Sequence, residues 1–289
     1  MQESEKLETT SEKKEFTVFD FWDRVGITKH WGGIYATQQL IQSCNITPNQ
    51  HVLEIGCGTG YTSSLLARKY QADVTAIDIS SKLLEQTKRR IKEQDVSDKV
   101  TITQADAHKL PFQANTFDAI IAESVLAFCD KKKASSEAYR VLKPNGIFGG
   151  NEATYLKPPP KQLLALFSES SFGVPLRVLQ QDEWQAVFRQ AGFAHVSSTV
   201  HPLNLWKQFI NNLRVDGAQR YIPAICQGIF DPTIRTTFLK KDMLKKSLQF
   251  LPYLGYGLYV GKKLEGAEGR PEPTDVIALS GYSCARVLV

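Results

Sequence analysis

The chain has 289 residues, 42% of them hydrophobic, which is enough to bury one large α/β core with an insertion. Its formal net charge of +5 is spread along the sequence, so composition gives no support for nucleic-acid binding. The five cysteines form no CxxC pair, which argues against a zinc site or a disulfide framework and favours a reducing, cytoplasmic setting.

The N-terminal region is expected to be a charged tail followed by a helical cap. Residues 1–15 are polar and charged, unlike the apolar core of a secretory signal peptide. Residues 16–44 contain two amphipathic segments separated by Gly32 and Gly33, which interrupt the helical periodicity. We therefore predict a cap over residues 16–48, made of two helices and a loop.

Strand-like and helix-like patterns alternate through the central part of the chain. Short apolar and β-branched runs predict five strands, at residues 51–55, 73–78, 100–104, 117–122 and 147–154. Parallel strands require crossover connections, so this alternation predicts a mostly parallel sheet with helices on both faces.

The helices between these strands have recognisable ends. Ser80 or Ser81 is expected to cap the helix after the second strand. A helix is predicted at residues 134–142, with Pro144 as its stop signal and a turn at residues 145–146.

The C-terminal part is expected to complete the sheet and to carry an insertion. A helix at residues 182–190 and strands at 193–200 and 257–262 bring the sheet to seven strands. Residues 203–249 read as a mostly helical insertion before the last strand, and they fit a lid or a packing layer equally well. Residues 265–289 are predicted to be a tail.

Three glycines stand at alternate positions where the first strand turns into a helix: Gly56, Gly58 and Gly60. Glycine suits such a turn because a Cβ would keep the backbone away from a ligand and would disfavour positive φ. Cys57 is the small residue that the turn admits. A dinucleotide fingerprint would need glycine where this chain has Tyr61, and the Gly-Lys-Ser/Thr of a P-loop is absent.

Acidic residues follow the next two strands. Asp78 ends the second strand, where a carboxylate can accept hydrogen bonds from both hydroxyls of a ribose. Asp106 and Ala107 follow the third strand, where a carboxylate and an amide suit the edge of an adenine ring. Each acid alone could be a solvated loop residue, but the carboxyl ends of parallel strands converge on one crevice.

These features together resemble the ordered motif series of class I S-adenosylmethionine-dependent methyltransferases. The similar segments span about residues 50–154, and they are VLEIGCGTG, the strand-ending Asp78, Ala105-Asp106-Ala107, FDAI and RVLKPNG. The Leu-Pro-Phe segment that follows Asp106 and the LKPNG turn most resemble those of the small-molecule branch of this superfamily. That branch includes ubiquinone/menaquinone, tocopherol and sterol C-methyltransferases. The resemblance implies a Rossmann-like domain over residues 16–264 with a cofactor-binding core at 49–155.

The resemblance also assigns cofactor contacts to particular residues. It implies that Glu54 and residues 56–60 hold the methionine end of S-adenosylmethionine, and that backbone near Glu123 accepts from its amino group. It further implies that Asp78, with Ile79 beside it, holds the ribose side, and that Asp106 and Ala107 hold the adenine.

Methyl transfer needs a base only when the attacking atom of the acceptor carries a proton. Candidates at strand ends or in the cap are Glu123, Glu152 and His30. The glutamates fit support of the cofactor or of a loop as well as they fit a base, and His30 fits packing against Trp31.

The acceptor is expected to be a small organic molecule held by the cap and the insertion. The chain lacks the Asp/Asn-Pro-Pro-Tyr/Phe segment that enzymes acting on base amines share, because Glu123 is followed by Ser-Val-Leu. Aromatic side chains suited to an apolar pocket wall are Trp31, Tyr35, Phe128 and Trp206. The insertion also fits an interfacial helix at a membrane surface. A non-catalytic cofactor-binding or scaffold protein is the alternative.

Overall fold

The computed structural model describes residues 30–168, 177–219, 222–223, 226, 230–232 and 249–266. The predicted tail at 1–15, the first cap helix, part of the helical insertion and most of the tail at 265–289 lie outside the described residues.

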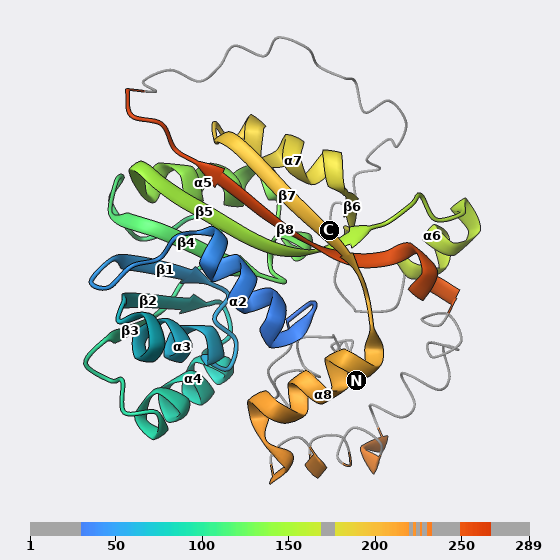
Figure 1. Cartoon of the computed structure of the whole chain (residues 1–289), viewed down its shortest axis with the longest axis horizontal. Coiled ribbons are helices and arrows are strands. Elements are labelled where there is room, and N and C mark those ends of the chain that lie inside the picture. The colour runs from blue at the N-terminus through green and yellow to red at the C-terminus, as the bar shows by residue number, and fades with distance from the viewer. Residues whose placement is uncertain are drawn as a thin grey trace, which may run out of the picture.

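An eight-stranded sheet runs through the molecule in the order β3-β2-β1-β4-β5-β8-β7, with the short β6 beside β5 (Figure 1). The strands are β1 His51–Ile55, β2 Asp73–Asp78, β3 Val100–Gln104, β4 Phe117–Glu123, β5 Leu142–Tyr155, β6 Leu179–Gln180, β7 Ala194–Pro202 and β8 Leu254–Lys262. Strands β1 to β6 pair in parallel, whereas β8 is antiparallel to both of its neighbours. The predicted mostly parallel α/β sheet is confirmed. The sequence missed β6 because a two-residue strand has no periodicity.

Helices cover both faces of this sheet. They are α2 Gly33–Ser43, α3 Tyr61–Tyr70, α4 Ser81–Glu93, α5 Lys131–Val141, α6 Lys161–Ser168, α7 Gln181–Gln190 and α8 Leu205–Asp216, with short 3₁₀ helices η1 Leu126–Phe128 and η2 Leu251–Tyr253. Apolar residues of α2, α3 and α4 join one buried cluster with the sheet, and those of α5 and α7 join another. Each helix is therefore held by burial of one apolar face. No helix in the described ranges is both long and apolar enough to span a bilayer.

The boundaries of α5 and β5 differ from the predicted ones for identifiable reasons. Helix α5 begins at Lys131 because the Asp130 side chain accepts from the Lys133 amide, and it ends at Val141, ahead of Pro144. The expected turn at residues 145–146 lies inside β5, where Asn145 has a φ of 65° and the register with β4 shifts. Strand β5 pairs with β4 at Leu142 and again from Ile147 on, so residues 143–146 form a bulge inside the strand, where the Asn145 amide donates to the Lys263 carbonyl.

The order of the strands locates a ligand crevice. The chain moves outward from β1 through β2 to β3, then returns to place β4 on the other side of β1. Such a reversal leaves an open crevice at the carboxyl ends of the central strands, where α/β proteins bind their ligands. The glycine turn and the acidic residues singled out above lie at this edge.

Candidate cofactor-binding site

The three glycines of the β1–α3 turn have different tasks. All three have positive φ: 73° at Gly56, 54° at Gly58 and 75° at Gly60. A Cβ at Gly56 would lie 2.3 Å from Val125, and one at Gly60 would lie 2.7 Å from Thr87, so both glycines serve close packing. A Cβ at Gly58 would meet nothing within 4 Å, so this glycine leaves open space at the loop surface. The loop thus leaves room for a ligand to come close to the backbone at Gly58.

Asp78 connects this turn to the next one. Its carboxylate accepts from the Gly58 amide and from the Ser80 amide, each at 2.9 Å. Ser80 in turn accepts from the Leu83 amide and caps α4, as one of the two predicted caps. Ile79 between them is 66% exposed, an unusual position for a large apolar side chain. Asp78 therefore fixes the shape of the crevice whether or not a ligand is bound.

Glu54 and Cys57 lie under the loop rather than at its open side. Both side chains are buried, and the Glu54 carboxyl accepts a hydrogen bond from the Ser63 hydroxyl in the first turn of α3. Burial raises the pKa of Glu54 to about 8, and the nearby charges of Glu123 and Asp78 add to this rise. Burial also raises the pKa of the Cys57 thiol, which keeps it protonated and unreactive.

Asp106 is oriented by a histidine that the sequence analysis did not single out. The Asp106 Oδ1 accepts from the His108 amide at 2.9 Å and from His108 Nδ1 at 2.7 Å. His108 Nε2 accepts from the Asp130 amide at 2.9 Å, so the ring proton must be on Nδ1. The signal in the sequence was the Asp-x-His spacing directly after a strand. Ala107 between them is buried.

A buried polar cluster, the Glu123 cluster, joins the cap to the end of β4. The Glu123 carboxylate accepts from the Thr37 and Thr62 hydroxyls, each at 2.8 Å, and from Asn151 Nδ2 at 3.3 Å. His30 Nδ1 lies 2.9 Å from Thr37 Oγ1 and 3.4 Å from Glu123 Oε1. The structure thus brings together His30 and Glu123, two of the three predicted candidate bases.

Glu152 has a different environment, although it lies close by on β5. Its carboxylate is fully buried and accepts from three backbone amides in and before η1, those of Val125, Leu126 and Ala127, at 2.8–3.1 Å. Burial raises the pKa of Glu152 to about 7, while these amides favour the charged form. The geometry is that of a carboxyl group that holds a loop.

The predicted aromatic wall is only partly brought together. Trp31 packs beside a small apolar cluster that includes Phe250, and Phe128 lies in η1. Tyr35 and Trp206 are 63% and 72% exposed, so neither lines an enclosed pocket in this structure.

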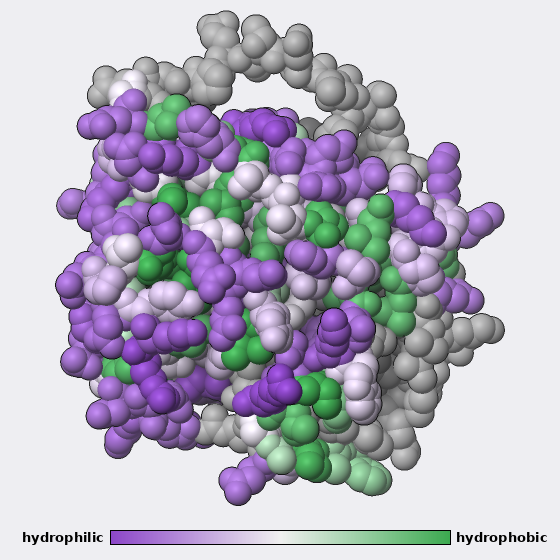
Figure 2. Space-filling model, in the orientation of Figure 1, coloured by the Kyte–Doolittle hydropathy of each residue, from purple (hydrophilic) through white to green (hydrophobic). Residues whose placement is uncertain are grey.

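Helix α8 is nevertheless attached to the cap. Gln208 Nε2 donates to the His30 carbonyl at 3.1 Å, and the Asn211 side chain packs where a Cβ at Gly33 would lie. Trp206 stacks on Phe209 with ring centroids 5.7 Å apart. Figure 2 shows apolar side chains exposed over this helix, which lies at the lower edge of the view. Part of the insertion therefore lies directly against the loop that carries His30.

Comparisons with known proteins agree with this geometry. Residues 53–149 match the model of a methyltransferase domain family. The uncharacterised methyltransferase YodH of Bacillus subtilis is 31% identical over 168 residues, which cover 57% of this chain and 68% of that protein. A demethylmenaquinone methyltransferase of Lactiplantibacillus plantarum is 35% identical over 123 residues, 42% of this chain and 50% of that one.

A solved structure extends the likeness to most of the chain. The [4+2]-cyclase SpnF superposes with a TM-score of 0.69 at 20% identity, covering 86% of this chain and 93% of that one. The shared fold therefore extends well beyond the matched residues 53–149. From the family match and the relatives together, the chain belongs to the class I S-adenosylmethionine-dependent methyltransferases that act on small molecules.

Proposed function

We propose that this enzyme binds S-adenosylmethionine along the ends of β1 to β4 and methylates an apolar small molecule such as a quinone, an isoprenoid or a lipid-like metabolite. The observation that carries the proposal is the row of ligand-facing groups at successive strand ends, with open space at Gly58. A side chain at position 58 would occupy this space, so glycine there leaves room for a bulky cofactor at the turn.

Each end of the cofactor has a matching group. The Asp78 carboxylate, held at the end of β2 by the amides of Gly58 and Ser80, is the group that we assign to the ribose hydroxyls. The amide and the ring of His108 both donate to Asp106 Oδ1, so Oδ2 is the oxygen that we assign to the adenine amino group, with the Ala107 amide beside it.

The remaining contacts complete the proposed cofactor site. Ile79, exposed next to Asp78, suits the face of the adenine ring. We assign the methionine end to the backbone of residues 56–60 and of Glu123. The buried Glu54 supports this end from below through α3.

Bound S-adenosylmethionine supplies an electrophilic methyl group with a neutral leaving group. The contribution of the chain is to orient the acceptor in line with that group, and positioning alone can account for about 7–11 kcal/mol of barrier lowering. The cap loop and α8, which contact each other, are the elements that we assign to this task.

We assign the base, for an acceptor that carries a proton, to His30. The Thr37 hydroxyl donates its hydrogen to Glu123, so its oxygen accepts from His30, and the ring proton of His30 is then on Nδ1. This tautomer leaves Nε2 as the acceptor nitrogen. Glu123 would stabilise the charged ring after it takes up a proton. We do not assign this role to Glu152, because its carboxylate accepts from three backbone amides.

The apolar class of acceptor is supported by two observations. Trp206 and Phe209 present a stacked, exposed aromatic pair on the helix that contacts the cap. The relative from Lactiplantibacillus plantarum is named a demethylmenaquinone methyltransferase. Exposed aromatic groups beside Lys207 also suit contact with a membrane surface from which a lipid-like acceptor is taken.

The test is turnover with a panel of acceptors. The full chain is incubated with S-adenosylmethionine and hydroxylated naphthoquinones, isoprenoid alcohols, or polar amines, and S-adenosylhomocysteine and methylated product are measured by mass spectrometry. We expect product from the first two groups. Product from the amines alone would contradict the proposed acceptor class, and bound cofactor that no acceptor consumes would favour the non-catalytic alternative.

Trp206→Ala tests the place of the acceptor. Because Trp206 is largely exposed, the substitution should leave the melting temperature and cofactor affinity unchanged while raising KM for the acceptor. Leu264→Ala, at an exposed apolar side chain just beyond the end of β8, is the control. Equal KM values for the two variants would remove α8 from the acceptor site.

A further inference from the structure

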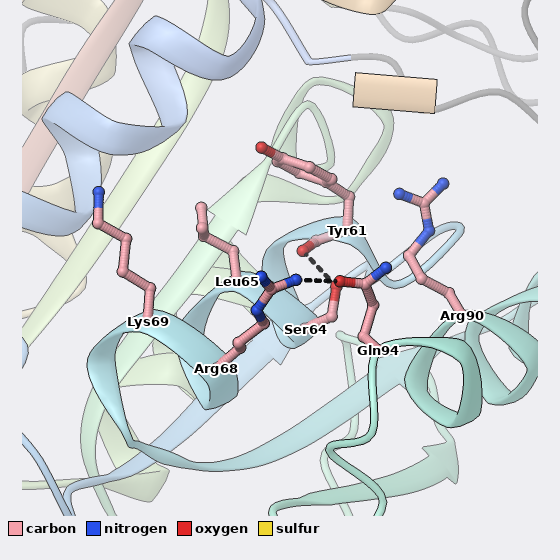
Figure 3. Close-up of a pocket in the computed structure, with 7 residues that line it drawn as sticks. All are labelled: Tyr61, Ser64, Leu65, Arg68, Lys69, Arg90 and Gln94. Atoms are coloured by element: carbon pink, nitrogen blue, oxygen red, sulfur yellow. Dashed lines mark hydrogen bonds between the residues drawn. The ribbon is translucent and has the colours of Figure 1, made fainter. Parts of the chain in front are cut away.

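A separate cavity lies between α3 and α4, away from the acidic groups of the crevice. It has a volume of about 430 Å³, and Figure 3 shows the side chains that line it. They come from one face of α3 and from the C-terminal half of α4, and the argument uses Tyr61, Leu65, Arg68, Lys69, Arg90 and Gln94. We call this cavity the α3–α4 groove.

The charge of the groove is entirely positive. Its lining contains three basic residues and no carboxylate. Arg68 donates to Gln94 Oε1 at 2.7 Å, a neutral partner that orients the guanidinium without compensating its charge. Lys69 lies 5.7 Å from the ring of Tyr70. Within the described part of the chain, neither Arg68 nor Lys69 forms an ion pair.

The groove also has an apolar wall. Tyr61 and Leu65 are one helical turn apart on α3, so their side chains lie on the same face. The Arg90 guanidinium lies 5.7 Å from the centroid of the Tyr61 ring, which places a cation at the end of this wall. Figure 3 shows Tyr61 and Arg90 on one side of the groove and Arg68 with Gln94 below them.

We propose that the α3–α4 groove binds the phosphate group of an amphiphilic phosphomonoester, with the apolar part of the ligand along Tyr61 and Leu65. Arg68 is the main anchor, because an oriented guanidinium binds phosphate with two parallel hydrogen bonds. Lys69 adds a point charge. Ordinary small-molecule sites have volumes of roughly 300–1,000 Å³, so the groove is large enough for such a ligand.

This site is distinct from the proposed cofactor site. Tyr61, the first residue of α3, borders both the glycine turn and the groove, but the proposed phosphate anchors Arg68 and Lys69 lie about two helical turns further along α3. Ser64, which also lines the groove, donates to the Gly60 carbonyl at 2.9 Å and keeps the two regions structurally continuous.

The ligand could be a free metabolite or the headgroup of a membrane lipid, and the experiment separates the two. Calorimetric titration of the full chain with hexyl phosphate measures the free form. Cosedimentation with phosphatidylcholine vesicles, with and without phosphatidic acid, measures the lipid form. Both are repeated with Arg68→Gln, and with Arg89→Gln as a control that removes the same charge from the exposed face of α4.

We expect at least one of the two probes to bind, and Arg68→Gln to weaken that binding about tenfold or more while Arg89→Gln leaves it unchanged. Binding of hexyl phosphate alone would identify the ligand as a free metabolite. Binding to vesicles with phosphatidic acid alone would identify it as a lipid headgroup. Saturating S-adenosylhomocysteine should displace neither. The proposal is overturned if neither probe binds, if the two variants have equal effects, or if S-adenosylhomocysteine displaces the probe.

Discussion

The two halves of the catalytic crevice are built in different ways. On the cofactor side, the contacts that shape the site join residues close in sequence: Asp78 to Gly58 and Ser80, and Asp106 to His108. On the acceptor side they join distant segments: Asn151 to Trp31 across 120 positions, and Gln208 to His30 across 178. A local motif can therefore specify the first half, whereas the second exists only after the chain has folded.

The largest expected effect is on catalysis at the acceptor side. His30→Gln should lower kcat about 10²–10⁴-fold for an acceptor that loses a proton, because it removes the nitrogen that takes it up. Cofactor affinity, measured by calorimetry, should stay the same, since His30 belongs to the other half. His195→Gln, at an exposed histidine on β7, is the control. A parallel loss of cofactor binding in His30→Gln would show that the halves are not independent.

The next effect is on cofactor affinity. Asp78→Ala should weaken S-adenosylmethionine binding by about 1.5–3 kcal/mol, the range for hydrogen bonds to a charged group. Asp73→Ala removes an exposed carboxylate from the other end of the same strand and serves as the control. If Asp78→Ala bound the cofactor as tightly as the control, Asp78 would lie outside the site.

A third effect is on the pH dependence of stability. The pKa of Glu54 is raised to about 8 in the folded state, so the folded state binds more protons than the unfolded chain between about pH 4.5 and 8. The contribution of Glu54 to stability is therefore present at low pH and is lost as pH rises through this window.

Glu54→Gln isolates this contribution. Between pH 5 and pH 8, the free energy of unfolding of the wild type should fall by at least about 1 kcal/mol more than that of the variant, since one pKa unit corresponds to about 1.4 kcal/mol. Urea titrations at several pH values measure the difference. Curves that stay parallel would mean that Glu54 is ionised in the folded protein at neutral pH.

The smallest effect tests how Asp106, the acid that we propose binds the adenine, is oriented. His108→Phe removes the side-chain contact to Asp106, which is worth about 0.5–1.5 kcal/mol, so cofactor affinity should fall roughly 2- to 10-fold. The discrimination between S-adenosylhomocysteine and its inosine analogue, which lacks the amino group, should fall with it. In Asp106→Asn, the further change His108→Phe should have no effect on that discrimination. If the effects of the two substitutions on this discrimination were additive, His108 would play no part in adenine recognition through Asp106.

Much of the fold was predictable because its signals are local. Alternating strands and helices, the glycine turn and Ser80 as a cap were read from the sequence and are present in the structure. The boundaries of α5 and β5 were less accurate. Asn145 keeps its turn conformation in a bulge of β5, because the strand pairs with β4 before and after it, at Leu142 and Ile147.

Within the candidate site, the sequence indicated which residue types matter but not their partners. Glu123 is the last residue of β4 and Glu152 lies three residues before the end of β5; both are buried acids, and nothing in the sequence separates them. One accepts from side-chain hydroxyls beside a histidine, and the other accepts from three backbone amides.

The sequence by itself thus determined the sheet and its helices, the glycine turn and the acids that follow β2 and β3, since periodicity and turn chemistry act over a few residues. Only the tertiary structure decided that His30 meets Glu123, that α8 attaches to the cap, and that α3 and α4 enclose a positively charged groove. The physical reason is that these contacts depend on how whole elements pack. How a helix packs is decided by the apolar surface that it buries against the whole sheet, and not by the residues next to it in the sequence.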